Sequence, residues 1–374
     1  MALKFPVISV TGPRQSGKTT LCKSVFENYT YVSLENPDIR EFALSDPKGF
    51  LNQYDKYVIL DEVQNVPNLF SYIQSIVDES GINGQFILSG SQNFLLSQQI
   101  SQSLAGRTYI FHLLPLSLEE LKPTDYYFRN TSAHIFYGGY PRLFKNDIHP
   151  NDFYPSYIQT YIERDLRTIA NVHNLNTFRQ FIKICAGRTG QLINTNAIGN
   201  QLGINHKTVK SWLSILESSF IIFTLKPWHK NFNKRIIKSS KLYFYDTGLA
   251  CSLLGIKDVS EIDVHFAKGA LFENFIISEV LKNNYNANTV KDLYFWRDNT
   301  GHEIDLIIEE THHAKFTEIK SSQTINPSYF KGLDYLYKIS ENENNERYVV
   351  YGGDEIQNRT DYTILPWNSL KPLQ

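Results

Sequence analysis

Residues 12–19 read Gly-Pro-Arg-Gln-Ser-Gly-Lys-Thr and satisfy the pattern GxxxxGK[ST]. The motif follows an apolar segment at residues 5–10 and precedes a helical pattern at residues 18–27, the strand–loop–helix context that it requires. In such a P-loop, backbone N–H groups surround phosphates, the lysine reaches the β- and γ-phosphates, and the threonine hydroxyl binds Mg²⁺. We therefore expect a nucleotide-binding site made of Gly12, Pro13, Arg14, Gln15, Ser16, Gly17, Lys18, Thr19 and Thr20.

A second motif weakens the alternative that this loop matches by chance. Four apolar residues, 57–60, lead directly into Asp61 and Glu62. A carboxylate at the end of a buried strand can hold the Mg²⁺ shell, as in a Walker B motif, and the adjacent glutamate can polarise the attacking water. The sequence therefore predicts ATP and Mg²⁺ as cofactors, Thr19 and Asp61 as metal ligands, and Glu62 as a catalytic residue.

Two more residues are candidates for catalysis. Ser91 follows the apolar segment 86–88 and could sense the γ-phosphate or orient water, although an ordinary turn at a strand end explains it too. Arg107 precedes a further strand, and an arginine at a phosphoryl-transfer site can raise the rate by roughly 10³–10⁵. A surface arginine paired with a carboxylate is equally consistent with the sequence. An Arg107 that acts in trans would require a homo-oligomer.

Apolar strands alternate with helical segments over the first part of the chain, which favours an α/β fold with a mostly parallel sheet. The 374 residues suggest two or three domains at about 150 residues each. We expect a P-loop domain at 1–145, a helical connector at 146–187, a winged helix-turn-helix at 188–256 and a further α/β domain at 257–374.

Composition excludes several classes of protein. With 42% hydrophobic residues the chain can bury sizeable cores, so wholesale disorder is excluded. Its three cysteines are scattered, which excludes a disulfide scaffold and favours a reducing cytoplasm. The apolar runs are too short to cross a bilayer, so we expect a soluble protein without a membrane partner.

The net charge of −1 conceals one basic segment. Residues 191–240 hold seven basic residues and one acidic residue, and their pattern favours a winged helix. In its second helix Val209, Trp212 and Leu216 share one face, which turns the lysines of that helix outward. The predicted DNA-binding residues are Lys207, Lys210, Lys234 and Arg235. A helical adaptor with a solvated basic face is the alternative.

A cluster of charged residues marks the C-terminal part. Asp305 precedes Glu318 by thirteen residues, and Glu318 and Lys320 are two apart in a predicted strand, so they share a face. Carboxylates and a lysine on paired strands can bind Mg²⁺ and activate water against a phosphodiester. Ordinary ion pairing at the surface is the alternative.

Several segments in order resemble a family of predicted prokaryotic ATPases, and the resemblance covers nearly the whole chain. The segments are GPRQSGKTTL, YVILDEVQNVP, FILSGSQNFLL, SLAGRTYIFHLLPLSLEE and FYGGYPRL. The resemblance implies an N-terminal AAA domain and a C-terminal domain of unknown function that is similar to restriction endonucleases. Within it, the order Asp305…Glu318-x-Lys320 resembles the PD-(D/E)XK nuclease signature, and Glu273 lies where such folds often add another acid.

The sequence thus supports two hypotheses. The first is an ATP-hydrolysing enzyme that couples nucleotide state to DNA binding, with cleavage by the nuclease-like domain left open. The second is a nucleotide-controlled protein-interaction module with a catalytically silent nuclease-like fold. A small-molecule kinase would explain neither the basic segment nor the carboxylate–lysine cluster.

Overall fold

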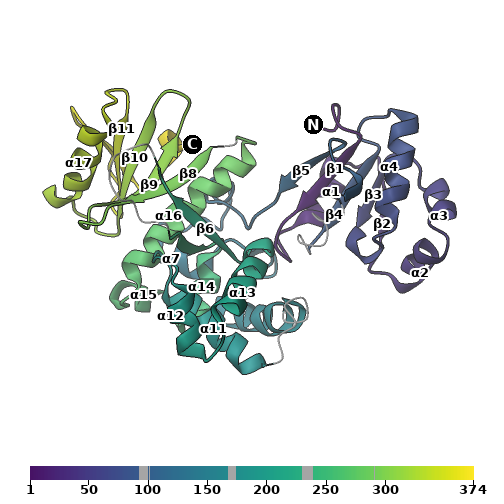
Figure 1. Ribbon diagram of the computed structural model, residues 1–374, viewed down its shortest axis with the longest axis horizontal. Helices are drawn as coiled ribbons and strands as arrows, with labels where there is room; N and C mark the ends of the chain where they lie inside the picture. Colours follow the sequence, from purple (N-terminus) through teal and green to yellow (C-terminus); the bar gives the residue numbers. More distant parts are fainter. Residues whose placement is uncertain (92–99, 101, 167–173, 230–238, 290) are drawn as a thin grey trace. The chain divides into compact units, whose positions relative to one another are not determined.

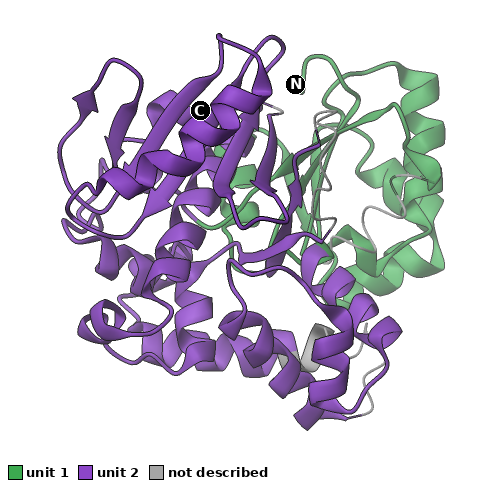
Figure 2. Ribbon diagram, turned by 60° about the vertical axis from the view of Figure 1, so that its left-hand side comes forward, with its two compact units in different colours: residues 1–115, 218–220 green, residues 116–217, 221–374 purple. Residues whose placement is uncertain are grey.

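The computed structural model describes residues 1–91, 100, 102–166, 174–229, 239–289 and 291–374. The chain divides into two compact units, which Figure 2 distinguishes by colour. Unit 1 comprises Met1–Pro115 with Ser218–Phe220, and unit 2 comprises Leu116–Glu217 with Ile221–Gln374. Among the described residues, no helix combines the length and the apolar character needed to cross a membrane. The boundaries of the four domains expected from the sequence stay a prediction.

Unit 1 is built on a five-stranded parallel sheet with the order β2–β3–β4–β1–β5 (Figure 1). Its strands are β1 (Val7–Thr11), β2 (Thr30–Ser33), β3 (Val58–Asp61), β4 (Phe86–Gly90) and β5 (Thr108–His112). The predicted parallel sheet is confirmed for this unit. Because β4 lies between β1 and β3, the carboxyl ends of these three strands meet at one edge of the sheet.

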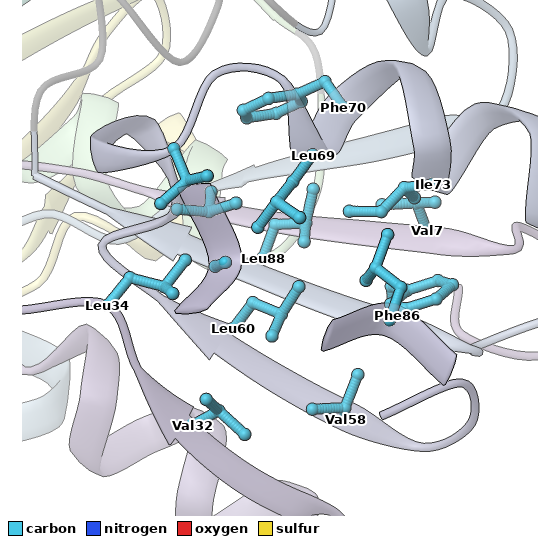
Figure 3. Close-up of a cluster of buried hydrophobic side chains, with 14 of the residues drawn as sticks. Val7, Val32, Leu34, Val58, Leu60, Leu69, Phe70, Ile73, Phe86 and Leu88 are labelled. Atoms are coloured by element: carbon cyan, nitrogen blue, oxygen red, sulfur yellow. The ribbon is translucent and has the colours of Figure 1, made fainter. Parts of the chain in front are cut away.

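Helices cover the sheet of unit 1. The described ones are α1 (Lys18–Val25), α2 (Pro37–Ser45), α3 (Pro47–Gln53), η1 (Val63–Asn65) and α4 (Leu69–Ser80). Figure 3 shows Leu69 and Ile73 of α4 lying over one face of the sheet, in the same buried cluster as Val7, Leu60 and Leu88. Alternation along each strand turns the neighbouring residues to the other face. There Ile8, Ile59 and Ile87 pack with Cys22 of α1.

Unit 2 begins with a largely helical region. Its helices up to the second sheet are α6 (Leu118–Leu121), α7 (Thr131–Tyr137), α8 (Pro141–Lys145), α9 (Pro150–Tyr157), the π-helix η2 (Ile158–Leu166), α11 (Leu175–Gly187), α12 (Thr195–Leu202) and α13 (His206–Ser218). The later ones are α14 (Thr247–Leu254), α15 (Val259–Val264), α16 (Lys268–Asn286), η3 (Pro327–Tyr329), α17 (Phe330–Ser340) and η4 (Lys371–Leu373).

An eight-stranded mixed sheet with the order β12–β13–β11–β10–β9–β8–β6–β7 runs through unit 2. Its strands are β6 (Ile222–Pro227), β7 (Lys241–Phe244), β8 (Asp292–Arg297), β9 (Glu303–Glu309), β10 (Ala314–Lys320), β11 (Glu346–Tyr351), β12 (Gln357–Asn358) and β13 (Thr363–Pro366). The antiparallel pair β6–β7 follows α13, and β6 also pairs in parallel with β8. Leu192 forms an isolated bridge with Lys241. One sheet therefore joins the basic segment to the C-terminal strands.

A buried carboxylate, Asp246, links separate helices of unit 2. Its Oδ1 accepts hydrogen bonds from the Tyr154 hydroxyl at 2.7 Å and from the Leu249 N–H at 2.9 Å. Its Oδ2 accepts from the Gly139 N–H at 2.7 Å. Burial and the neighbouring charge of Asp246 raise the pKa of Tyr154 well above its usual value, so this hydroxyl stays a donor. Asp246 thereby caps α14 and holds α9 and the segment after α7 against it.

Replacement of Asp246 by alanine should lower the free energy of unfolding of unit 2 by about 3 kcal/mol, because three buried donors lose their acceptor. Denaturation followed by tryptophan fluorescence measures this unit selectively, since all four tryptophans, Trp212, Trp228, Trp296 and Trp367, lie in it. Asp125→Ala, at an exposed position, is the control. An unchanged midpoint for Asp246→Ala would show that Asp246 does not stabilise the unit.

Candidate functional site

Two glycines give the P-loop its path between β1 and α1. Gly12 has φ +152°, and a Cβ at this position would lie 2.0 Å from the carbonyl oxygen of Leu113. Gly17 caps the N-terminus of α1 in the left-handed region, at φ 93°. Side chains are excluded at the first position by contact and disfavoured at the second by conformation. The glycines of the motif are thus required by backbone geometry.

Lys18 points back into its own loop. The Lys18 Nζ donates to the carbonyl oxygens of Gly12 at 3.1 Å and Pro13 at 2.7 Å. Burial lowers the pKa of Lys18 to about 8, although the carboxylates of Glu62 and Asp61 act in the opposite direction. The loop carbonyls therefore hold the ammonium group where an anionic ligand would compete for it.

The loop also presents polar atoms that have no protein partner. The Gln15 Oε1 and the Ser16 Oγ are buried and accept or donate no hydrogen bond within the described part of the chain. Unsatisfied buried polar atoms are costly and rare, so their concentration beside Lys18 indicates a place for a polar ligand. The Arg14 side chain is partly exposed and lies 3.7 Å from Glu35. Thr20 is exposed on α1.

Asp61 is the centre of the hydrogen bonds at this edge of the sheet. Its Oδ2 accepts from the Thr19 Oγ1 at 2.9 Å and from the Tyr31 hydroxyl at 2.8 Å. Its Oδ1 accepts from the hydroxyl of Ser89. Burial, followed by the bond to Asp61, raises the pKa of Tyr31 to about 12. The oxygens of Thr19 and Asp61 are hard ligands side by side, a donor set that fits Mg²⁺.

Glu62 follows in the left-handed conformation, at φ 55°. Its Oε2 accepts from the Ser91 N–H at 3.3 Å, from the Ser91 hydroxyl at 3.1 Å and from the Gln64 side-chain amide. The two carboxylates that the sequence singled out therefore lie together beside the P-loop. Ser91 is brought to this site as a partner of Glu62.

Sequence reasoning missed Tyr31, Ser89 and Gln64. Ser89 belongs to the same strand end as Ser91, so the insertion of β4 between β1 and β3 could have pointed to it. The sequence offered no comparable signal for Tyr31, because β2 reaches Asp61 only through its parallel pairing with β3.

Arg107 lies away from this site in its own chain. It precedes β5, and its carbonyl oxygen accepts from the Val7 N–H at 3.2 Å, at the start of β1. The P-loop follows the opposite end of β1. The guanidinium group is paired with Asp78, with Nε–Oδ1 at 2.5 Å and Nη2–Oδ2 at 2.8 Å. The geometry therefore gives Arg107 no contact with phosphates bound in cis.

The structure brings together the four predicted residues of the nuclease-like site. Asp305 of β9 accepts from the Lys320 Nζ at 3.3 Å and from the Ile319 N–H at 2.8 Å. Lys320 also lies 2.6 Å from the Oε1 of Glu318 on β10. Glu273 joins them from α16 through Lys241, which the sequence analysis did not include. Burial, followed by the charge of Asp305, raises the pKa of both Glu273 and Glu318 above the usual range of a glutamate.

Lys241 lies in the middle of the acids. Its Nζ is 3.0 Å from Glu273, 2.5 Å from Glu303 and 4.0 Å from Asp305. Burial alone would lower the pKa of Lys241, but these carboxylates outweigh it and keep the pKa above its usual value. Among the described residues, no group of three acids, histidines or cysteines is arranged to hold a metal ion. As arranged, the cluster does not fit Mg²⁺.

The basic segment is described in part. Lys207 and Lys210 are exposed on α13, whereas Val209, Trp212 and Leu216 are buried, as their spacing predicted. Lys234 and Arg235 lie outside the described residues.

Comparison with protein families divides the chain into three matched regions. Residues 4–122 match an AAA domain, residues 129–260 match a domain of unknown function (DUF8612), and residues 268–370 match a second domain of unknown function (DUF4143). The N-terminal match coincides with the P-loop and the parallel sheet of unit 1. The resemblance to an AAA-type P-loop ATPase is thus confirmed, with a DUF4143 domain at the C-terminal end.

Individual relatives extend over most of the chain. An uncharacterized protein of Mycobacterium tuberculosis is 30% identical over 327 residues, which cover 86% of this chain and 71% of the relative. An uncharacterized protein of Haemophilus influenzae is 24% identical over 312 residues, 75% of this chain and 76% of that protein. Among solved structures, RuvB of Thermotoga maritima has a TM-score of 0.29 at 16% identity, covering 58% of this chain and 81% of RuvB. This structural similarity is too low to assign a fold or a role to the chain.

The lowered pKa of Lys18 predicts proton uptake on nucleotide binding. At pH 8 the Lys18 amine of the nucleotide-free protein is about half protonated. Bound phosphates would favour the protonated form, so nucleotide binding should take up about 0.5 proton. Calorimetric titrations with ATP in two buffers of different ionisation enthalpy measure this number. Uptake should vanish below pH 6.5 and in Lys18→Arg, and affinity should fall as the pH rises above about 8. Equal heats in both buffers at pH 8 would contradict the account.

Proposed function

The chain belongs to the family of AAA-domain proteins that includes its mycobacterial relative, and from this premise we propose that it binds ATP with Mg²⁺ and hydrolyses the β–γ anhydride. The observation that carries the proposal is the contact of Thr19 with Asp61 beside the P-loop, with Glu62 next in the chain. A phosphate-binding loop alone would account for binding. The adjoining carboxylate pair supplies what hydrolysis requires.

The residues of unit 1 have distinct tasks in this proposal. The loop N–H groups and Lys18 bind the phosphates, and Lys18 exchanges its bonds to loop carbonyls for bonds to phosphate oxygens. Thr19 and Asp61 would hold Mg²⁺, which neutralises charge that develops on the phosphates when it is bound. Glu62 polarises the attacking water, and Ser91 fixes its carboxylate.

Tyr31 and Ser89 act as positioning residues, because each donates a hydrogen bond to Asp61 and so orients its carboxylate. Arg107 is assigned a structural role, supported by its bidentate pairing with Asp78. A homo-oligomer in which Arg107 contacts the nucleotide of a second copy is the alternative.

We further propose that the basic segment is a winged helix that binds DNA and that nucleotide state controls this binding. Two observations support it: α12 and α13 are followed by the β6–β7 pair, and Lys207 and Lys210 are exposed on α13. Exposed lysines on a second helix can contact phosphates in the way that recognition helices do. A surface for protein partners is the alternative, in which case DNA changes neither binding nor hydrolysis.

The C-terminal part is proposed to have a nuclease-like core, because β9 and β10 bring Asp305, Glu318 and Lys320 together. Its use for cleavage depends on a metal that the acids, as arranged, do not hold. The proposed location is the cytoplasm, which the three free cysteines favour.

ATP hydrolysis with and without DNA tests the proposal in wild type, Lys18→Ala and Glu62→Gln. Lys18→Ala should abolish nucleotide binding, whereas Glu62→Gln should bind ATP and hydrolyse it about 10²–10⁴-fold more slowly, because it lacks the group that polarises water. DNA should stimulate wild-type hydrolysis. Arg107→Ala is the control and should keep its activity, because Arg107 pairs with Asp78. Loss of hydrolysis with intact nucleotide binding in this variant would instead indicate that Arg107 acts in trans. If Glu62→Gln hydrolysed ATP as fast as the wild type, Glu62 would not be the residue that polarises the attacking water.

The salt dependence of DNA binding tests the basic helix. With about four phosphate contacts, log K should fall with log salt at a slope near −3.6, and Lys207→Ala/Lys210→Ala should reduce the slope by about 1.8. Fluorescence anisotropy with a labelled duplex measures both slopes. The control is Lys48→Ala/Lys331→Ala, which removes two lysines at other exposed positions. A slope near zero in the wild type would favour the protein-interaction module.

A further inference from the structure

Lys241 is buried among acids that come from two other elements. It begins β7, whereas Glu273 belongs to α16, and Glu303 and Asp305 belong to β9. The Tyr243 hydroxyl donates to Glu273 Oε1 at 2.5 Å, beside the 3.0 Å contact of Lys241 with the same oxygen. The side chain of Lys241 is 3% exposed. Its ammonium group is therefore enclosed by carboxylates.

The remaining oxygens of the cluster are largely engaged as well. Asp305 Oδ2 accepts from the Ile319 N–H and from Lys320, and Glu318 Oε1 lies 2.6 Å from Lys320. Arg297 lies 3.3 Å from Glu303 Oε2. Glu318 Oε2 is buried with no partner among the described residues. Because most of these oxygens already contact protein groups, few of the roughly six ligands that Mg²⁺ takes are left.

We propose that Lys241 is the resident cation of this cluster, so that the acids of the nuclease-like core form a closed ion-pair site that takes up neither Mg²⁺ nor Mn²⁺. The four acidic groups of Glu273, Glu303, Asp305 and Glu318 face three cationic groups, those of Lys241, Lys320 and Arg297, so at most one unit of negative charge is left uncompensated. A divalent ion at Glu273 and Asp305 would lie next to the ammonium group and be repelled by it.

The carboxylates around Lys241 also make its removal costly to the stability of the fold. A buried charge that loses its partner is strongly destabilising, and here several carboxylates would lose theirs at once. The ammonium group also links β7, which follows α13 and β6 in the chain, to α16 and to β9. The inference does not depend on ATP hydrolysis, because every residue that carries it lies in unit 2.

Titration of Mn²⁺ into the full chain without nucleotide, followed by electron paramagnetic resonance, tests the proposal. The wild type should show no submillimolar Mn²⁺ site that depends on Asp305. Lys241→Met should gain one Asp305-dependent site, at least about tenfold tighter than any Asp305-dependent site of the wild type, because the repelling charge is gone. Lys241→Met/Asp305→Asn should lose that site again. The control is Lys315→Met, which removes a paired lysine of the same sheet, 2.9 Å from Glu310, and should gain no site.

An Mn²⁺ site in the wild type that disappears in Asp305→Asn would overturn the proposal, and so would Mg²⁺-dependent nicking of DNA that Asp305→Asn abolishes. If Lys241→Met does not fold, the comparison of wild type with Asp305→Asn decides the matter alone. ATP hydrolysis measured on the same preparations keeps the outcome separate from the proposed function, since a failed ATPase assay leaves the Mn²⁺ result unaffected.

Discussion

The hydrogen bonds that converge on Asp61 are the interaction on which the candidate nucleotide site depends. Three hydroxyl groups, from Thr19, Tyr31 and Ser89, donate to its two oxygens. They can do so because the parallel sheet places the ends of β1, β3 and β4 side by side, with β2 next to β3. A buried carboxylate held by three donors has one orientation, so the proposed metal ligand is positioned before any ligand arrives. This preorganisation is what electrostatic catalysis requires.

Unit 2 uses buried charge in a different way. Asp246 accepts only from neutral donors and fixes helices, whereas the C-terminal acids surround a lysine. Both arrangements satisfy carboxylates that burial would otherwise penalise. The difference has a functional consequence, because the buried ammonium group of Lys241 places a positive charge where a metal ion would have to bind, whereas neutral donors add no such charge. The residues proposed for a nuclease-like site therefore lie close together, yet their arrangement favours a structural ion-pair cluster.

The sequence predicted local features well and their partners poorly. The P-loop, Asp61 and Glu62 were predictable because each belongs to a short motif in which the chemistry fixes the order of neighbouring residues. The faces of α13 were predictable from helical periodicity at Val209 and Trp212. Tyr31 and Lys241 were not, because their acids lie on elements that are distant in the sequence, β3 for Tyr31 and both α16 and β9 for Lys241. Arg107 was left between alternatives, and only the direction of β5 separates it from the P-loop of its own chain.

The central claim is that unit 1 is an ATPase whose metal ligand is Asp61. Single-turnover hydrolysis of γ-labelled ATP by the full chain, comparing wild type with Asp61→Asn and Asp78→Asn, tests it most directly. The account predicts phosphate release in the wild type and in Asp78→Asn, with a loss of at least about a hundredfold in Asp61→Asn. Equal rates in wild type and Asp61→Asn, or no release by folded wild type with Mg²⁺ and DNA, would contradict it.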